Sequence, residues 1–175
     1  MYHNALSTAP KMCMATKDMK ARARAEVYYG NETCREKFML LLSEIGLPNG
    51  LLTIEEIEEC GYVKDTGFFW LRHKKKRDYC KFESVVICYD NEVTAYFERN
   101  KITNLTGVKA KELLIWISLS EIYVNHNDRN RITFKTPAGF SKSFPLSVFK
   151  FEAIVAKGEA EAKEVDEPKD VKLIV

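Results

Sequence analysis

The 175-residue chain lacks the features that mark most common enzyme classes. It has only eight glycines and no glycine-rich phosphate loop, since neither G-x-G-x-x-G nor G-x-x-x-x-G-K occurs. No apolar run approaches the ~18 residues that a membrane-spanning helix needs. The five cysteines form no C-x-x-C pair and have no histidine at ligand spacing. The sequence therefore predicts no nucleotide-dependent chemistry, no membrane span, no zinc site and no closed disulfide set, and it implies no cofactor.

The first 18 residues lack the marks of a targeting signal. Residues 1–17 contain no acid, but they also have no apolar core for a signal peptide and no arginine for a transit peptide. We expect a disordered leader over residues 1–18 and a cytoplasmic protein, with import into an organelle as the alternative. The cysteines are then expected to be reduced and mostly buried.

The net charge is small, but it is unevenly distributed. The 27 Lys+Arg nearly balance the 25 Asp+Glu, and the pI of 8.2 lies below the value of about 9 typical of a nucleic-acid-binding domain. Residues 152–175 hold seven acids, four bases and no aromatic residue, which leaves a net charge of +5 on residues 1–151. We expect a mildly basic folded body, an acidic disordered tail over residues 152–175, and no nucleic-acid partner.

Aromatic residues divide the body into a helical first part and a β-rich remainder, since 16 of the 20 lie between Tyr62 and Phe151. The spacing of apolar residues predicts helices over residues 19–30, 31–45 and 53–60. The second ends at Gly46, and the third opens with the capping box Thr53-x-x-Glu56, with its glutamates on the outer face. We expect a single domain over residues 19–151, with helices in 19–61 and an antiparallel sheet in 62–151.

Alternating hydrophobicity and turn residues predict the strands. They are expected over residues 68–72, 85–89, 92–98, 101–105, 131–135 and 140–144, with tight turns at Asp90–Asn91 and Arg99–Asn100. The segment Glu112–Val124 is apolar in both registers, which predicts a central strand covered on both faces. The fold class is therefore α+β, mainly β. We expect a small antiparallel β-barrel, complete or incomplete, with N-terminal helices, because a sheet of this size must hide its edges.

A run of cationic residues is the sharpest local feature of the sequence. It directly follows the aromatic segment Phe68–Leu71 and could hold the phosphate of an anionic headgroup, but a solvated hairpin tip is the favoured interpretation, since lysine is a common device against edge pairing. Two tryptophans could line a ligand cavity, but a tryptophan on a strand that is apolar on both faces is more often a core residue, so we expect Trp116 in the core. The candidate ligand-binding residues are Trp70, Arg72, Lys74, Lys75, Lys76, Arg77 and Trp116.

Signals for a hydrolase are weak. Gly139–Ser143 lacks the second glycine of a G-x-S-x-G nucleophile elbow. A serine, Ser141 or Ser143, or a cysteine could pair with His73 or His126, but both histidines are expected in polar, solvated loops. No catalytic set is therefore assigned.

Several segments together resemble a plant family called domain of unknown function 538. They are Ile45–Leu52, Val63–Gly67, Leu105–Trp116, Ile132–Pro137 and Ser143–Pro145. The resemblance covers residues 22–151 and implies a plant source and a β-barrel-like fold with N-terminal helices. Members of this family have been compared with lipid-binding proteins of the bactericidal permeability-increasing type, and they are associated with stress responses and trichome development. The resemblance implies the same for this chain. The family's recurring residues are mostly glycines, prolines and apolar positions, so the resemblance supplies no catalytic residues.

Three hypotheses for the function remain. The first is a non-enzymatic, monomeric binding module for an apolar or amphipathic, lipid-like small molecule, with the barrel interior as its cavity and peripheral membrane contact through Arg72–Arg77. The second is an esterase-like hydrolase. The third is a protein-interaction module that acts through the acidic tail.

Overall fold

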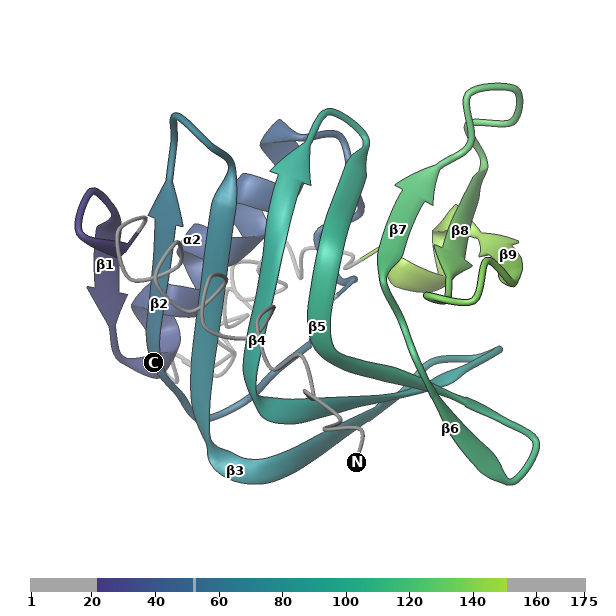
Figure 1. The fold of residues 1–175 in the computed structure, drawn as a ribbon, viewed down its shortest axis with the longest axis horizontal. Coiled ribbons are helices and arrows are strands. Elements are labelled where there is room, and N and C mark those ends of the chain that lie inside the picture. Colours follow the sequence, from purple (N-terminus) through teal and green to yellow (C-terminus); the bar gives the residue numbers. More distant parts are fainter. Residues whose placement is uncertain (1–21, 52, 151–175) are drawn as a thin grey trace, which may run out of the picture.

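The computed structural model describes residues 22–51 and 53–150, so the predicted leader and acidic tail lie outside the described residues. One long helix and nine strands make up most of it, and a short 3-10 helix, η1, ends it (Figure 1). In chain order, the elements are β1 (Glu26–Tyr29), α2 (Asn31–Glu44), β2 (Ile57–Val63), β3 (Phe68–Lys81), β4 (Val86–Glu98), β5 (Lys101–Glu112), β6 (Ile115–Ser118), β7 (Glu121–Val124), β8 (Arg131–Lys135), β9 (Ser141–Pro145) and η1 (Leu146–Phe149).

All strands belong to one antiparallel sheet. Its order is β1-β2-β3-β4-β5-β7-β8-β9, and β6 pairs with β5 beside this path. The sheet therefore forks at β5, whose first residues pair with β7 and whose last residues pair with β6. The α+β, mainly β class is confirmed. The sheet is not closed, however, so a complete barrel is not formed and the predicted barrel is not confirmed; β1 and β9 end the hydrogen-bonded order.

The three longest strands bend at the same level of the sheet. Between the pairs Arg72–Glu92 and Arg77–Asp90, β3 has four residues where β4 has one. Between Tyr89–Val108 and Thr94–Thr106, β4 in turn has four residues where β5 has only Gly107. Extra residues of this kind bend a strand and increase its twist. Beyond the bend, the ends of β3, β4 and β5 and all of β6 run off together as a four-stranded extension, which we call the arm (residues 77–90 and 107–118; Figure 1).

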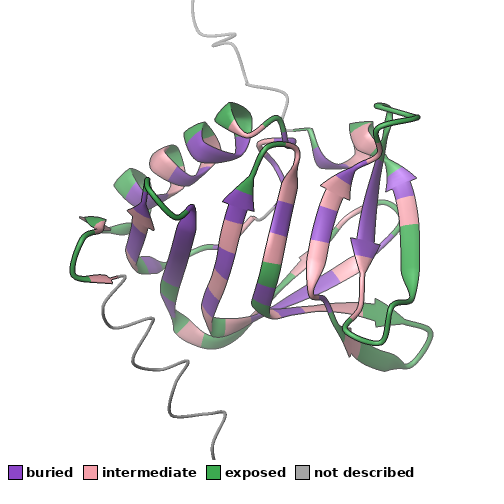
Figure 2. Cartoon of the chain, turned by 45° about the horizontal axis from the view of Figure 1, so that its top comes forward, coloured by how far each residue is buried: buried purple, intermediate pink, exposed green. Residues whose placement is uncertain are grey.

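Helix α2 confirms the second predicted helix and packs on one face of the sheet (Figure 2). Its buried side chains, Cys34, Phe38, Leu41 and Leu42, recur at helical spacing. Phe38 lies 5.0 Å from Phe69 between ring centroids, and Phe69 in turn stacks on Phe97 at 4.9 Å. Gly46 has a φ of 83°, the left-handed conformation in which glycine ends a helix.

The first predicted helix is wrong from residue 26 to residue 29, although Arg22 is helical, and the third predicted helix is not formed. Glu26–Tyr29 is strand β1 and Ile57–Val63 is strand β2, and the two pair with each other. Instead of capping a helix, the hydroxyl of Thr53 bonds the carbonyl oxygen of Gly50. Sheet pairing supplies the backbone hydrogen bonds here, so tertiary context overrides the local helical spacing.

Two further predictions fail for a similar reason. Asp90–Asn91 is no turn, because β4 runs continuously through it and the Asp90 carboxylate is held by Lys109 and Arg77. Glu112–Val124 is no central strand, because the chain reverses at Leu113–Leu114. The Arg99–Asn100 turn is confirmed, with Asn100 at a φ of 59°, and the strand over residues 131–135 is confirmed as β8.

The bend requires glycine at position 107. Gly107 has a φ of 76°, and a Cβ there would collide with the carbonyl oxygen of Glu92. We predict that Gly107→Ala lowers the free energy of unfolding by about 3 kcal/mol or more, because the backbone of Glu92 cannot move away from the new methyl group without disturbing the sheet. Gly139→Ala is the matched control: its φ is 90° and nothing lies within 4 Å of its Cβ, so only the cost of about 1–2 kcal/mol for a left-handed residue remains. Urea unfolding compares the two; equal losses would contradict the prediction.

Candidate functional site

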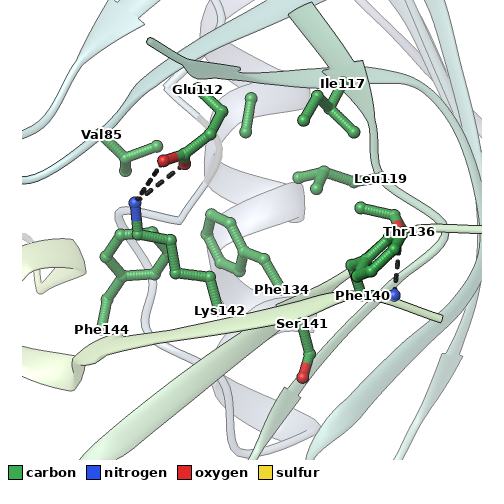
Figure 3. Close-up of a pocket in the computed structure, with 11 residues that line it drawn as sticks. Val85, Glu112, Ile117, Leu119, Phe134, Thr136, Phe140, Ser141, Lys142 and Phe144 are labelled. Atoms are coloured by element: carbon green, nitrogen blue, oxygen red, sulfur yellow. Dashed lines mark hydrogen bonds and ion pairs between the residues drawn. The ribbon is translucent and has the colours of Figure 1, made fainter. Parts of the chain in front are cut away.

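An apolar cavity of about 260 Å³ lies in the gap between the arm and the β8–β9 hairpin (Figure 3). One wall comes from the arm and the residues next to it: Val85, Ala110, Glu112, Ile117 and Leu119. The other comes from β8, β9 and their turn: Phe134, Thr136, Phe140, Ser141, Lys142 and Phe144. The cavity therefore lies where the sheet forks, between the branch formed by β6 and the branch formed by β8 and β9.

Strand pairing explains why the cavity is apolar. Ala110 pairs with Ile87 on one side and Ile117 on the other, so a small side chain sits between two large ones and leaves space. On the opposite wall, the rings of Phe134 and Phe144 lie 5.1 Å apart. Both rings also contact Phe149 of η1, which is buried. Phe134, Phe144 and Phe149 thus pack as one aromatic cluster behind this wall.

An ion pair crosses the rim of the cavity. Nζ of Lys142 lies 2.8 Å from one carboxylate oxygen of Glu112 and 3.2 Å from the other, and both side chains are about half exposed. The pair joins β9 to the end of β5. Exposed ion pairs contribute only about 0–1 kcal/mol, so either charge can exchange its partner for a ligand group at little cost.

A second ion-pair network holds the far wall in place. Glu121 of β7 lies 2.8 Å from Nζ of Lys101 in β5 and 3.1 Å from Nζ of Lys135 in β8. Hydrogen bonds from these two lysines lower the pKa of the Glu121 carboxyl. Strands β5 and β7 are paired at only two positions, Lys101 with Tyr123 and Ile102 with Ile122. The ion pairs of Glu121 therefore reinforce a short contact between these two strands.

The cationic run Arg72–Arg77 lies across the bend of β3 and is not a hairpin tip. Arg72 contacts Glu59 at 3.1 Å, Lys75 lies 3.5 Å from Asp78, and Arg77 lies 3.7 Å from Asp90. Glu55, Glu56 and Glu58, which were expected on a helix, add further contacts to Arg72 and Lys75. Within the described part of the chain, Lys74 and Lys76 are exposed and form no ion pair. None of the run lines the cavity, and its role in binding stays a prediction.

The two tryptophans lie in different surroundings. Trp70 is 2% exposed; its ring covers Gly61 and its Nε1 donates to Glu59 at 2.8 Å. Trp116 is 38% exposed, so the expected core position is wrong for it. Neither residue lines the cavity. Of the wall residues, the sequence singled out only Ser141, as a candidate nucleophile. The apolar wall residues were missed, because their only signal was the alternation of apolar residues along short strands.

The proposed nucleophile–base pairs are not assembled among the described residues. His73 is buried in β3, not in a polar loop as predicted; its Nε2 lies 2.8 Å from the carbonyl oxygen of Asp90 and its Nδ1 has no partner. The hydroxyl of Ser143 bonds that of Thr133 at 2.8 Å. His126 lies in the β7–β8 loop, as predicted. In residues 22–51 and 53–150, no serine or cysteine side chain hydrogen-bonds to a histidine.

The described cysteines are free thiols. Cys34, Cys60 and Cys88 are buried and Cys80 is partly buried, which confirms the predicted burial for these four, whereas Cys13 lies outside the described residues. Burial raises the pKa of all four thiols.

No group of three His, Cys, Asp or Glu side chains in the described segments is arranged to hold a metal ion. Among the same residues, no helix is long and apolar enough to cross a membrane.

Comparison with known proteins identifies a family and no individual relative. A family model described as "Protein of unknown function, DUF538" matches residues 38–150, which include the bend, the arm and both walls of the cavity. No curated protein and no solved structure matches the chain.

The network around Glu121 predicts an acid-sensitive junction. Because the pKa of Glu121 is lowered in the folded protein, its stabilising effect is present above the ordinary glutamate pKa of about 4.3 and is lost as the pH falls below it. We expect Glu121→Gln to lower the free energy of unfolding by about 1 kcal/mol at neutral pH. In acid, where Glu121 of the wild type is protonated too, the difference in unfolding free energy between the two proteins should become smaller. Urea unfolding at several pH values measures both, and a difference independent of pH would contradict this account.

Proposed function

The chain belongs to the DUF538 family, and we propose that its domain is a non-enzymatic binding module for an amphipathic, lipid-like small molecule. One observation carries the proposal: the gap between the arm and the β8–β9 hairpin is an apolar cavity with a charged rim. The two parts of this site suit the two parts of such a ligand.

The walls suit an apolar group of limited size. Burying apolar surface contributes about 25 cal/mol per Å², so even a short chain or a single ring gains useful free energy. The volume of about 260 Å³ lies just under the lower end of typical ligand sites, near 300 Å³. The proposed guest is therefore the end of a chain or one ring, with the remainder of the ligand outside.

The rim suits an anionic head group. Lys142 can turn from Glu112 to a carboxylate or phosphate, and such a charge-assisted hydrogen bond is stronger than one between neutral groups. Arg72 and Arg77, which were candidates for this role from the sequence, are instead held by Glu59 and Asp90. The proposal therefore places the head group at Lys142.

The other hypotheses gain no support from a particular contact. The esterase-like alternative lacks an assembled nucleophile–base pair among the described residues, and the acidic tail of the interaction hypothesis lies outside them. A plant source, the association with stress responses and trichome development, a cytoplasmic location and a monomeric state stay predictions from the sequence and the resemblance.

Two variants separate the roles of wall and rim. Ala110→Leu fills the space between Ile87 and Ile117, so we expect it to weaken binding of both decanoate and decanol by about tenfold or more. Lys142→Gln removes the cation, so we expect it to weaken decanoate by about tenfold and to leave decanol unchanged. Isothermal titration calorimetry measures both affinities.

The matched control is Lys64→Gln, which removes an exposed lysine in the β2–β3 turn, away from the cavity. It should bind both probes like the wild type. The proposal fails if the wild type binds neither decanoate nor decanol, or if Ala110→Leu, with an unchanged melting temperature, binds them as tightly as the wild type does.

A further inference from the structure

The tip of the β5–β6 hairpin presents large apolar side chains to solvent. Leu113 and Leu114, at the turn, are 89% and 91% exposed, and Ile115 next to them is also exposed. Figure 2 shows this hairpin as an exposed projection at the lower right of the molecule. Single exposed apolar residues are common on protein surfaces, whereas three in a row on a projecting turn are not.

The turn is also built from an unfavourable residue. Leu113 has a φ of 54°, a left-handed conformation that glycine or asparagine adopts more easily than leucine. Leu113 therefore neither favours the backbone conformation of the turn nor contributes to the hydrophobic core. A function outside the folded domain explains why the side chain is both exposed and apolar.

Behind the tip lie an aromatic pair and lysines. The ring of Trp116 lies 5.6 Å from that of Tyr79, and Nζ of Lys111 lies 5.9 Å from the centre of the Trp116 ring. Lys81 lies on the same outer face of the arm: it pairs with Val86, and the next residue, Ile87, pairs with Ala110, which directly precedes Lys111.

The charges at this end of the molecule leave those lysines available. Asp90 is held by Arg77 and Lys109, and Glu112 is held by Lys142. Glu83 in the β3–β4 turn is a further exposed acid at this end. Among the described residues, Lys81 and Lys111 form no ion pair.

We propose that the β5–β6 tip docks on an anionic lipid bilayer. Leu113 and Leu114 would enter the acyl region, Trp116 and Tyr79 would lie at the level of the head groups, and Lys81 and Lys111 would contact lipid phosphates. A protein partner or a second copy fits less well. A stable protein interface buries about 800 Å² on each side, whereas this apolar tip is narrow and convex.

The proposal does not rest on the cavity, because the tip residues Leu113 and Leu114 do not line it. Glu112 links the two regions, since it precedes the turn and holds Lys142 at the cavity rim. Docking by the tip would bring this rim close to the bilayer surface.

Vesicle sedimentation of the full chain tests the docking. The probe is a vesicle of phosphatidylcholine and phosphatidylserine in equal parts. We expect the wild type to sediment with it and the variant Leu113→Asn/Leu114→Ser to bind more than about tenfold more weakly, with a melting temperature no lower than that of the wild type. Leu40→Ser, which removes an exposed leucine of α2, is the matched control and should bind like the wild type.

Tryptophan fluorescence supplies a second readout. The chain has only two tryptophans, and Trp70 is buried, so a blue shift on adding vesicles reports Trp116. We expect the shift in the wild type and in Leu40→Ser but not in the tip variant. Lys81→Gln/Lys111→Gln should weaken binding to these vesicles but not to vesicles of phosphatidylcholine alone.

Three results would overturn the proposal. They are a wild type that does not bind the vesicles, a tip variant that binds them as well as the wild type does, and a wild type that forms a dimer by sedimentation equilibrium which the tip variant does not form. If decanoate binding fails while vesicle binding succeeds, only the proposed cavity function is lost. If vesicle binding fails while decanoate binding succeeds, only the docking proposal is lost.

Discussion

The close approach of β4 to β5 at Gly107 is the constraint on which the structure depends. The absence of a side chain there lets the backbone of Glu92 lie against β5, and the four-for-one register changes in β3 and β4 follow the same bend. Without the bend, the arm would continue the plane of the sheet, and its apolar face would have nothing opposite it. With the bend, that face meets the β8–β9 hairpin across a gap, and this gap is the cavity.

The bend also explains the cationic run. His73, Lys74, Lys75 and Lys76 are the extra residues of β3 at this level, opposite Asn91 alone. His73 is buried, whereas Lys74 and Lys76 are exposed. The run therefore reflects a bulge in a long strand and its local ion pairs, and the charge density in the sequence did not point to the cavity, which none of these residues lines.

The parts of the fold that depend on neighbours in sequence were predictable. Helix α2 has its buried residues at helical spacing with Gly46 after it, and the turn at Asn100 has a residue that tolerates positive φ. The strands β1 and β2 were not predictable from the sequence, because their backbone hydrogen bonds are made to each other and to β3. The cavity was not predictable either, since Ala110 and Phe144 lie 34 residues apart and neither carries a recognisable motif.

The sequence by itself determined the mainly β class, the family, the main helix and the mild positive charge of the folded body, because composition, periodicity and turn chemistry are local properties. Only the tertiary structure decided that the sheet stays open, that Leu113–Leu114 projects where a central strand was expected, and that acids pair with Arg72, Lys75 and Arg77 of the cationic run. The physical reason is that strand pairing and ion pairing join residues far apart in the chain, and no local pattern records which partners meet.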